Sequence, residues 1–306
     1  MSGMRAPATD GVRPVPRVRS ALFIPGSRAD FLAKADQRGA DAVLIDLEDS
    51  VVEGQIDAAR ASVSEWIRAR PSAVDPVVCV RLHAPDDDEL DADLDAVVHA
   101  CLTAVLVPKV THEDQVVAVA EALAYHEGRR GMPRGQVRIW PLVETAAAVQ
   151  RADRIASASG RVAFMGGGTS RQGDIARAIG FRWSAEGLET LFLRSKVLVD
   201  VRAAGVPNPI SGLVSSLEGT DELETFARQS RALGYEGLMV IHPSQVALVN
   251  EVFSPTAEER QEARDVLAAL AAAEAQGLGA VTYRGRMIDR ANIETIHASG
   301  LADGEG

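Results

Sequence analysis

Short apolar runs, each followed by a stretch with helical spacing, recur along this chain of 306 residues at intervals of about 25 to 35 residues. The runs are apolar throughout, which is typical of strands buried on both faces of a parallel sheet. We place them at residues 20–25, 42–46, 76–82, 104–109, 137–143, 162–165 and 237–241, with a weaker candidate near 209–210. Eight such units in roughly 230 residues predict an α/β fold, a (β/α)8 TIM barrel, and disfavour an open sheet.

The sequence predicts eight helices and a chain that consists of three parts. Apolar spacing of three and four residues predicts helices at 30–38, 58–69, 90–100, 115–126, 146–158, 188–203, 221–233 and 257–275. Residues 19–253 are predicted to form the barrel. Residues 1–18 contain arginines but no apolar segment of a signal peptide, so we interpret them as a mobile tail. Residues 254–306 follow the eighth strand and are predicted to form a C-terminal arm or lid.

Composition narrows the classes of partner. The net charge of −11 argues against a nucleic-acid surface and against binding to an anionic membrane. The two cysteines form no disulfide framework, and no apolar run approaches the length of a transmembrane helix. We therefore expect a cytoplasmic protein that acts on a small molecule.

Charged side chains follow several of the predicted strands. In a barrel of this type the active site lies at the carboxyl ends of the strands. The residues that this rule brings together are Pro25, Gly26, Glu48, Asp49, Arg81, Lys109, Glu144, Asp174 and His242. Cations, carboxylates and a histidine around one mouth indicate a site for a small anionic substrate.

Two of these carboxylates, Glu144 and Asp174, follow successive strands. A site with few oxygen ligands suits Mg²⁺, which keeps several waters and lets the substrate supply further ligands. The alternative interpretation is structural, because acidic residues also favour the first turn of a helix.

Three other features keep two interpretations open. Lys109 either holds Glu48 or Asp49 in an ion pair or serves the site directly. His242, before a proline, is expected to be a hydrogen-bonded histidine of the barrel mouth more readily than a base. The glycines at 166–168 lack the third glycine of a dinucleotide fingerprint. They would instead let backbone amides approach a carboxylate.

Seven motifs occur in an order that resembles a known family. They are RSALFIPG at 19–26, DAVLIDLEDSV at 41–51, VRL at 80–82, VPK at 107–109, PLVET at 141–145, IHP at 241–243 and MID at 287–289. Together they resemble the citrate lyase β-subunit-like branch of the HpcH/HpaI aldolase superfamily, which includes malyl-CoA and citramalyl-CoA lyases. The resemblance covers nearly the whole chain.

The resemblance implies a (β/α)8 barrel, a divalent metal and cleavage or formation of a carbon–carbon bond, commonly in a CoA thioester. The metal is expected to be Mg²⁺, with Mn²⁺ as a substitute, held by Glu144 and Asp174. Arg81 would bind the α-keto acid and polarise its carbonyl. Asp289 would be the acid that a C-terminal lid brings to a neighbouring subunit. Glu48 and Asp49 match the acidic pair of the family.

Substrate binding is assigned to Arg81 and Gly173, and the candidate cations for CoA phosphates are Arg19, Arg28 and Lys34. The chain departs from the family pattern at Ile56, His83 and Ser211 and in the longer segment before Asp174. These departures leave the CoA thioester and the substrate open.

Three functions follow from these observations. The first is a Mg²⁺-dependent lyase that cleaves a β-hydroxyacyl-CoA such as malyl-CoA or citramalyl-CoA. The second is an aldolase that acts on a free hydroxy-keto acid and releases pyruvate or glyoxylate. The third is a non-catalytic subunit of a larger lyase complex. For assembly we expect a homotrimer or a dimer of trimers, in which Asp289 completes the active site of a neighbour.

Overall fold

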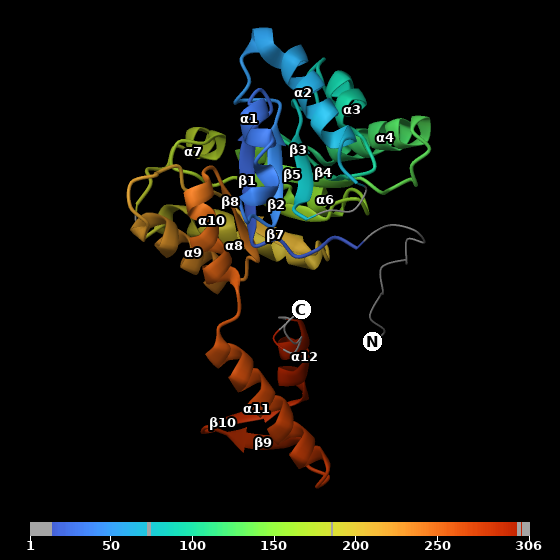
Figure 1. Cartoon of the computed structure of the whole chain (residues 1–306). Coiled ribbons are helices and arrows are strands. Elements are labelled where there is room, and N and C mark those ends of the chain that lie inside the picture. Colours follow the sequence, from blue (N-terminus) through green and yellow to red (C-terminus); the bar gives the residue numbers. More distant parts are fainter. Residues whose placement is uncertain (1–13, 72–74, 185, 299–300, 302–306) are drawn as a thin grey trace. The chain divides into compact units, whose positions relative to one another are not determined.

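The structure is a computed structural model that describes residues 14–71, 75–184, 186–298 and 301. The chain divides into two compact units, Met1–Phe253 and Ser254–Gly306. The first unit contains a closed parallel barrel with strand order β1 to β8 around the ring (Figure 1). The predicted (β/α)8 barrel is therefore confirmed.

The eight strands occupy the places that the apolar runs predict, including the weak seventh. Their bounds are β1 Ser20–Pro25, β2 Ala42–Asp46, β3 Val77–Arg81, β4 Leu102–Val107, β5 Arg138–Val143, β6 Phe164–Gly167, β7 Asn208–Ser211 and β8 Gly237–Val240. The ring closes where Ala21 of β1 pairs with Met239 of β8. Every strand thus points its carboxyl end to the same face.

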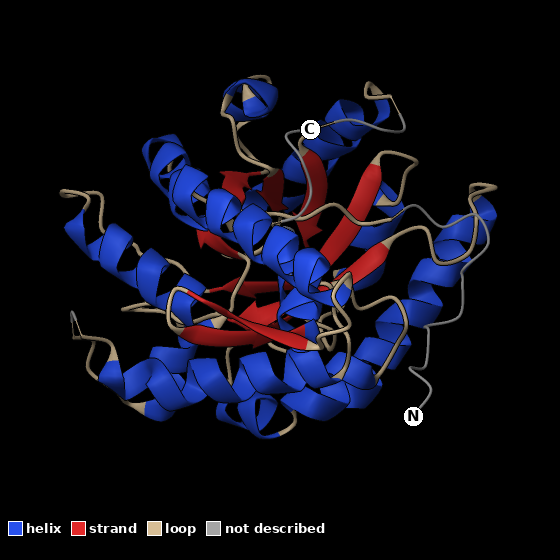
Figure 2. Ribbon diagram, turned by 90° about the horizontal axis from the view of Figure 1, so that it is seen from below, coloured by secondary structure: helices blue, strands red, loops and turns tan. Residues whose placement is uncertain are grey.

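Two apolar layers hold the barrel together. The inner layer includes Trp140 and Phe164, which stack with ring centroids 5.0 Å apart inside the ring of strands. The outer layer packs the other faces of the strands against the surrounding helices (Figure 2). Because both faces are buried, the strands need apolar residues at nearly every position, which is the pattern of the sequence.

The helices of the first unit follow the predicted order with some changes of extent, and α7 and α10 were not predicted. Their bounds are α1 Ala29–Leu32, α2 Ile56–Arg68, α3 Leu90–Val97, α4 Glu113–Arg129, α5 Ala146–Gln150, α6 Ala152–Ser157, α7 Asp174–Ile179, α8 Leu188–Ala203, α9 Asp221–Leu233 and α10 Pro243–Phe253. The helix predicted at 30–38 is instead α1 followed by a separate 3-10 turn, Ala35–Gln37. The helix predicted at 146–158 is interrupted at Arg151, which pairs with Glu113 of the neighbouring α4.

Two of the three glycines at 166–168 belong to a strand, whereas Gly168 lines the pocket at the carboxyl ends of the strands. Gly166 and Gly167 belong to β6 itself. A Cβ on Gly166 would lie 1.5 Å from the carbonyl oxygen of Ile210. The absence of a side chain therefore allows β6 and β7 to approach each other closely.

The second unit has a small core of its own. It consists of α11 Ala257–Glu274, the antiparallel strands β9 Ala280–Tyr283 and β10 Arg286–Asp289, and α12 Arg290–Ala298. Val266 and Leu270, from the apolar face of α11, are buried with Ile288 of β10. The apolar face of α11 is therefore packed against the hairpin of β9 and β10, which the sequence analysis did not predict. The role of this unit as a lid remains a prediction.

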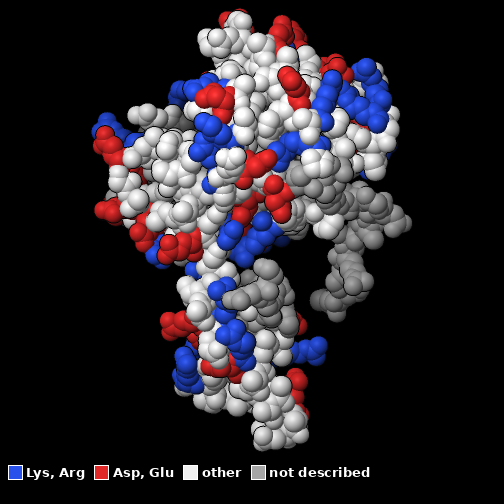
Figure 3. Space-filling model, in the orientation of Figure 1, with Lys and Arg blue, Asp and Glu red and all other residues white. Residues whose placement is uncertain are grey.

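Acidic and basic side chains are interspersed over the face of the barrel unit drawn in Figure 3. Among the described residues, no helix is long and apolar enough to cross a membrane.

Candidate active site

The carboxyl ends of the strands surround a pocket of about 400 Å³. Arg81 ends β3, Lys109 lies in the turn after β4, and Glu144 directly follows β5. The segment between β6 and α7 adds Gly173 and Asp174 to the wall. Five of the nine residues predicted for the barrel mouth, Asp49, Arg81, Lys109, Glu144 and Asp174, therefore line one pocket, whereas Pro25, Gly26, Glu48 and His242 are not among its lining residues.

Arg81 is fixed by three carboxylates. Its Nε and Nη2 donate to the two oxygens of Asp46, each at 2.7 Å, and its Nη1 donates to Asp49 at 2.9 Å. Nη1 also lies 3.2 Å from Glu48 Oε2. Burial alone would lower the pKa of Arg81, but the bonds to Asp46 and the nearby carboxylates raise it. Arg81 is therefore a permanent cation in a set orientation.

Asp46, at the end of β2, was not singled out from the sequence. It is 2% exposed and accepts hydrogen bonds from the backbone of Glu48 and Ser50, each at 3.0 Å, in addition to those from Arg81. Burial would raise its pKa, but the bonds from Arg81 outweigh that effect and hold the pKa below the usual value. The sequence did contain a signal for Asp46, because it is a carboxylate at the end of an otherwise apolar strand. A buried carboxylate requires a hydrogen-bond or ion-pair partner.

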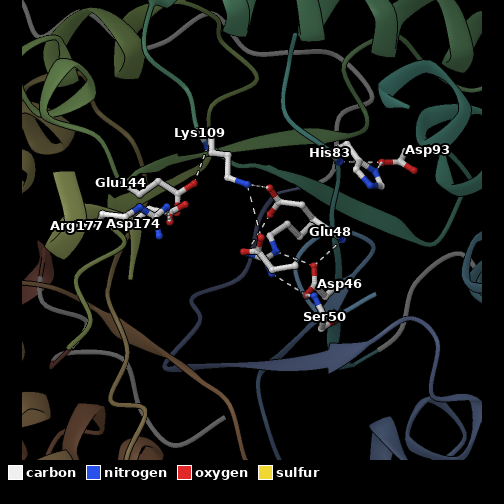
Figure 4. A network of polar contacts seen from close by, with 11 residues as sticks. Asp46, Glu48, Ser50, His83, Asp93, Lys109, Glu144, Asp174 and Arg177 are labelled. Atoms are coloured by element: carbon white, nitrogen blue, oxygen red, sulfur yellow. Dashed lines mark hydrogen bonds and ion pairs between the residues drawn. The ribbon is translucent and has the colours of Figure 1, made fainter. Parts of the chain in front are cut away.

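Lys109 joins two walls of the pocket (Figure 4). Its backbone N–H donates to Glu144 Oε1 at 2.6 Å, and its Nζ donates to Glu48 Oε1 at 2.5 Å. Nζ also lies 3.6 Å from Asp49. The ion-pair interpretation of Lys109 is therefore correct, and its backbone adds a contact that the sequence did not indicate.

Glu144, directly after β5, and Asp174, the first residue of α7, lie close to each other (Figure 4). Burial, followed by the charges of Asp174 and Glu48, raises the pKa of Glu144 to about 7, although the N–H of Lys109 opposes the shift. Glu144 does not cap the next helix, because Thr145 accepts the capping bond from Ala148 at 3.0 Å. Its carboxylate is therefore available to the pocket.

Asp174 is both the first residue of α7 and a residue of the pocket wall. Its carboxylate accepts a hydrogen bond from Arg177, one turn further along the helix. Gly173 precedes it, and a Cβ there would lie 2.2 Å from Ser170 Oγ. The longer segment before Asp174 thus folds closely against itself and still delivers the carboxylate to the mouth.

The pocket carries an excess of negative charge. Five carboxylates, those of Asp46, Glu48, Asp49, Glu144 and Asp174, face three cations, Arg81, Lys109 and Arg177, which leaves a formal charge of −2. Glu48 Oε2 is buried and accepts no hydrogen bond, although its charge is paired with Arg81 Nη1 at 3.2 Å. Facing carboxylates with an incompletely satisfied oxygen are a donor set that fits a hard divalent cation. Within the described residues, no three His, Cys, Asp or Glu side chains form a complete metal cage. Such a site would therefore rely on water or substrate for its other ligands.

Two cations predicted for the site, Arg19 and Lys34, are not among the residues that line the pocket, whereas the predicted role of Asp289 in a neighbouring subunit remains a prediction. Arg19 precedes β1 and forms a bidentate ion pair with Asp41, both contacts at 2.8 Å, at the amino end of the strands. Its predicted place at the barrel mouth is therefore wrong, because a residue before a parallel strand lies at the opposite face. Lys34 is exposed beyond α1. His242 binds Ser244 Oγ at 2.8 Å, as expected for a hydrogen-bonded histidine. Asp289 ends β10 in the second unit.

The positions that depart from the family pattern have structural partners. His83 binds Asp93 at 2.7 Å, and Asp93 also accepts from Arg60 at 2.7 Å, so this buried cluster connects β3 to α2 and α3. Ser211 exchanges a hydrogen bond of 3.0 Å with Ser230. Ile56 packs against the outer apolar layer. None of these three residues is among those that line the pocket.

An eight-stranded barrel with acidic and basic side chains at its carboxyl ends defines a TIM-barrel enzyme. The chain belongs to the HpcH/HpaI aldolase/citrate lyase family, whose model matches residues 19–243. It is a lyase of that family, so the predicted resemblance is confirmed and a purely non-catalytic role is set aside.

Three relatives illustrate the relationship. A citrate lyase subunit beta-like protein of Deinococcus radiodurans is 36% identical over 279 residues, which cover 89% of this chain and 92% of the relative. The L-malyl-CoA/beta-methylmalyl-CoA lyase of Cereibacter sphaeroides is 30% identical, with 90% and 91% covered. The solved structure of protein CitE from Mycobacterium tuberculosis, in complex with magnesium, acetoacetate and coenzyme A, is 27% identical, with a TM-score of 0.71 and 93% and 96% covered.

Proposed function

We propose that this protein is a Mg²⁺-dependent carbon–carbon lyase that cleaves a β-hydroxyacyl-CoA, such as malyl-CoA or citramalyl-CoA, to an acyl-CoA and a 2-keto acid. The observation that carries the proposal is the pair of carboxylates, Glu144 and Asp174, in one pocket with Arg81. A magnesium-bound solved relative supports the choice of metal. Mn²⁺ offers the same oxygen preference and is proposed as a substitute.

Five charged residues at the carboxyl ends of the strands have roles in this reaction. Glu144 and Asp174 would hold the metal, which, when bound, polarises the oxygen of the hydroxy or keto group as a Lewis acid. Arg81 would bind the substrate carboxylate and stabilise charge on that oxygen. A carboxylate, from Glu48 or Asp49, accepts the hydroxyl proton. The electrons of the broken carbon–carbon bond pass to the thioester enolate, which then takes up a proton.

The test is a cleavage assay with Mg²⁺ on a panel of CoA thioesters and free hydroxy-keto acids. Wild type and the control Glu113→Gln should cleave one member of the panel, whereas Glu144→Gln and Asp174→Asn should not. Glu113 suits the control because it binds Arg151 outside the pocket. Metal-independent turnover, or full activity of both pocket variants, would refute the proposal.

A second candidate is the aldolase that acts on a free hydroxy-keto acid. Two observations favour it. Arg19 lies at the wrong face of the barrel to bind a CoA phosphate, and Arg28 is already paired with Asp30 at 2.9 Å. The same panel separates the two candidates, because the aldolase would release pyruvate or glyoxylate from a substrate without CoA.

We also propose that the protein works as a homotrimer or a dimer of trimers, with Asp289 acting in a neighbour's site. The support is a separate compact unit, Ser254–Gly306, that carries Asp289 beside Met287, whose side chain is 76% exposed. A lid from a partner would exclude water from the enolate. Mixing Asp289→Ala with Glu144→Ala should restore part of the activity. No recovery after demonstrated subunit exchange would refute shared sites.

A further inference from the structure

Lys109 has an unusual backbone conformation for a lysine. Its φ is +53°, and the only other described non-glycine residue with positive φ is Arg284, in the turn between β9 and β10. Residues with a Cβ are disfavoured in this left-handed region, where glycine and asparagine are tolerated. A strained residue in a pocket wall indicates that its conformation serves a purpose there.

The backbone of Lys109 shows one purpose. The left-handed turn after β4 directs its N–H at Glu144, and the bond to Oε1 is 2.6 Å long. A carboxylate with one oxygen held by a donor has a restricted orientation and leaves the second oxygen for another ligand. The turn after β4 thus sets the direction of a side chain that follows β5.

The side chain of Lys109 shows a second purpose. Glycine at this position would give the same N–H without strain, but it would have no contact with Glu48. The ammonium group binds Glu48 Oε1 at 2.5 Å, and Figure 4 shows the side chain between Glu144 and Glu48. Position 109 needs both a left-handed backbone conformation and a cationic side chain. These two requirements explain why lysine is present there despite the strain.

We infer that Lys109 is a positioning residue with two tasks: its left-handed N–H orients Glu144 for a divalent cation, and its ammonium group holds Glu48 beside Arg81. The inference rests on the proposed function, because Glu144 is the proposed metal ligand. The affinity of the site for the metal would then depend partly on the conformation of the turn after β4.

A matched pair of variants separates the two tasks. Lys109→Asn and Lys109→Val both remove the ammonium group, but asparagine tolerates the left-handed region whereas β-branched valine does not. Mg²⁺ affinity is measured by calorimetry and folding by circular dichroism. Lys109→Val should bind Mg²⁺ roughly tenfold more weakly than Lys109→Asn. If Lys109→Val fails to fold, Lys109→Ala and Lys109→Gly give the same comparison.

The backbone task and the side-chain task of Lys109 are tested by different measurements. Equal Mg²⁺ affinity within the folded pair would overturn the backbone task, and so would the absence of Mg²⁺ binding by wild type. A crystal structure of Lys109→Asn should show Glu48 moved from its place beside Arg81, and an unmoved Glu48 would overturn the side-chain task. A wild type that binds Mg²⁺ but cleaves no member of the substrate panel would refute the proposed function alone, because neither readout here uses turnover.

Discussion

The substitution Asp46→Asn tests how far the pocket depends on a residue that lies beneath it. Asp46 accepts both of the 2.7 Å hydrogen bonds that fix Arg81 from one side, and it is 2% exposed. Asparagine keeps the shape of the side chain but removes the charge. Its amide group would also place a donor against a donor of Arg81.

The expected loss of stability follows from the burial of the pair. Removing one partner of a buried ion pair destabilises a protein by about 3–5 kcal/mol, because the remaining charge loses its compensation. Arg81 would keep its contacts with Glu48 and Asp49, so we expect the lower end, about 3 kcal/mol. In a unit of this size that corresponds to a fall in melting temperature of roughly 6–12 °C.

The assay is denaturant and thermal unfolding of Asp46→Asn beside the control Asp49→Asn. Asp49 binds the same arginine at 2.9 Å, but its side chain is 59% exposed, so its loss should change the unfolding free energy by less than about 1 kcal/mol. Because the pKa of Asp46 is depressed in the folded state, its contribution is present above the unfolded pKa of about 4 and is lost as pH falls below it. Similar losses in both variants would refute the reasoning.

Three further outcomes are expected. Glu144→Gln and Asp174→Asn should lower metal-dependent turnover by at least roughly 100-fold, measured against Glu113→Gln, and normal Mg²⁺ affinity in either pocket variant would exclude that residue as a ligand. Because burial raises the pKa of Glu144 to about 7, a proton competes with the metal below that pH. Mg²⁺ affinity in calorimetry should therefore fall up to about tenfold per pH unit below pH 7 and level off above it, and a flat profile from pH 6 to 8 would contradict this. Arg81→Lys should lose roughly 100-fold in kcat/KM because lysine lacks the planar fork of donors, and near-normal activity would reduce Arg81 to a structural role.

The strands were predictable because burial on both faces leaves a continuous apolar run, which is a local signal. The interruption of the helix at Arg151 was not predictable in this way, since Arg151 pairs with Glu113 of the neighbouring α4. The hairpin of β9 and β10 was also missed. Its strands are short and mostly half-exposed or exposed, with Ile288 as the buried exception, so they show no apolar run.

The position of a site residue could be predicted from the sequence where the direction of its strand determines the face on which it lies. Residues after a parallel strand share one face of the barrel, and this rule gathered Arg81, Lys109 and Glu144 correctly. The same rule applied to Arg19, which precedes its strand, would have placed it at the opposite face. The contacts between these residues could not be predicted from the sequence, because the pairing of Arg81 with Asp46 depends on how side chains pack inside the closed ring.

The unequal exposure of the partners of Arg81 bears on its proposed role, because it suggests how the arginine would bind a substrate without losing its position. Asp46 is buried and holds Nε and Nη2, whereas Asp49 is 59% exposed and meets only Nη1. A substrate carboxylate entering from the pocket can replace Asp49, which water already solvates, at little loss of free energy. Replacing Asp46 would strand a buried carboxylate. In the proposed reaction Arg81 would therefore be held by Asp46 through Nε and Nη2, and Nη1, which also lies 3.2 Å from Glu48 Oε2, would meet the substrate in place of Asp49.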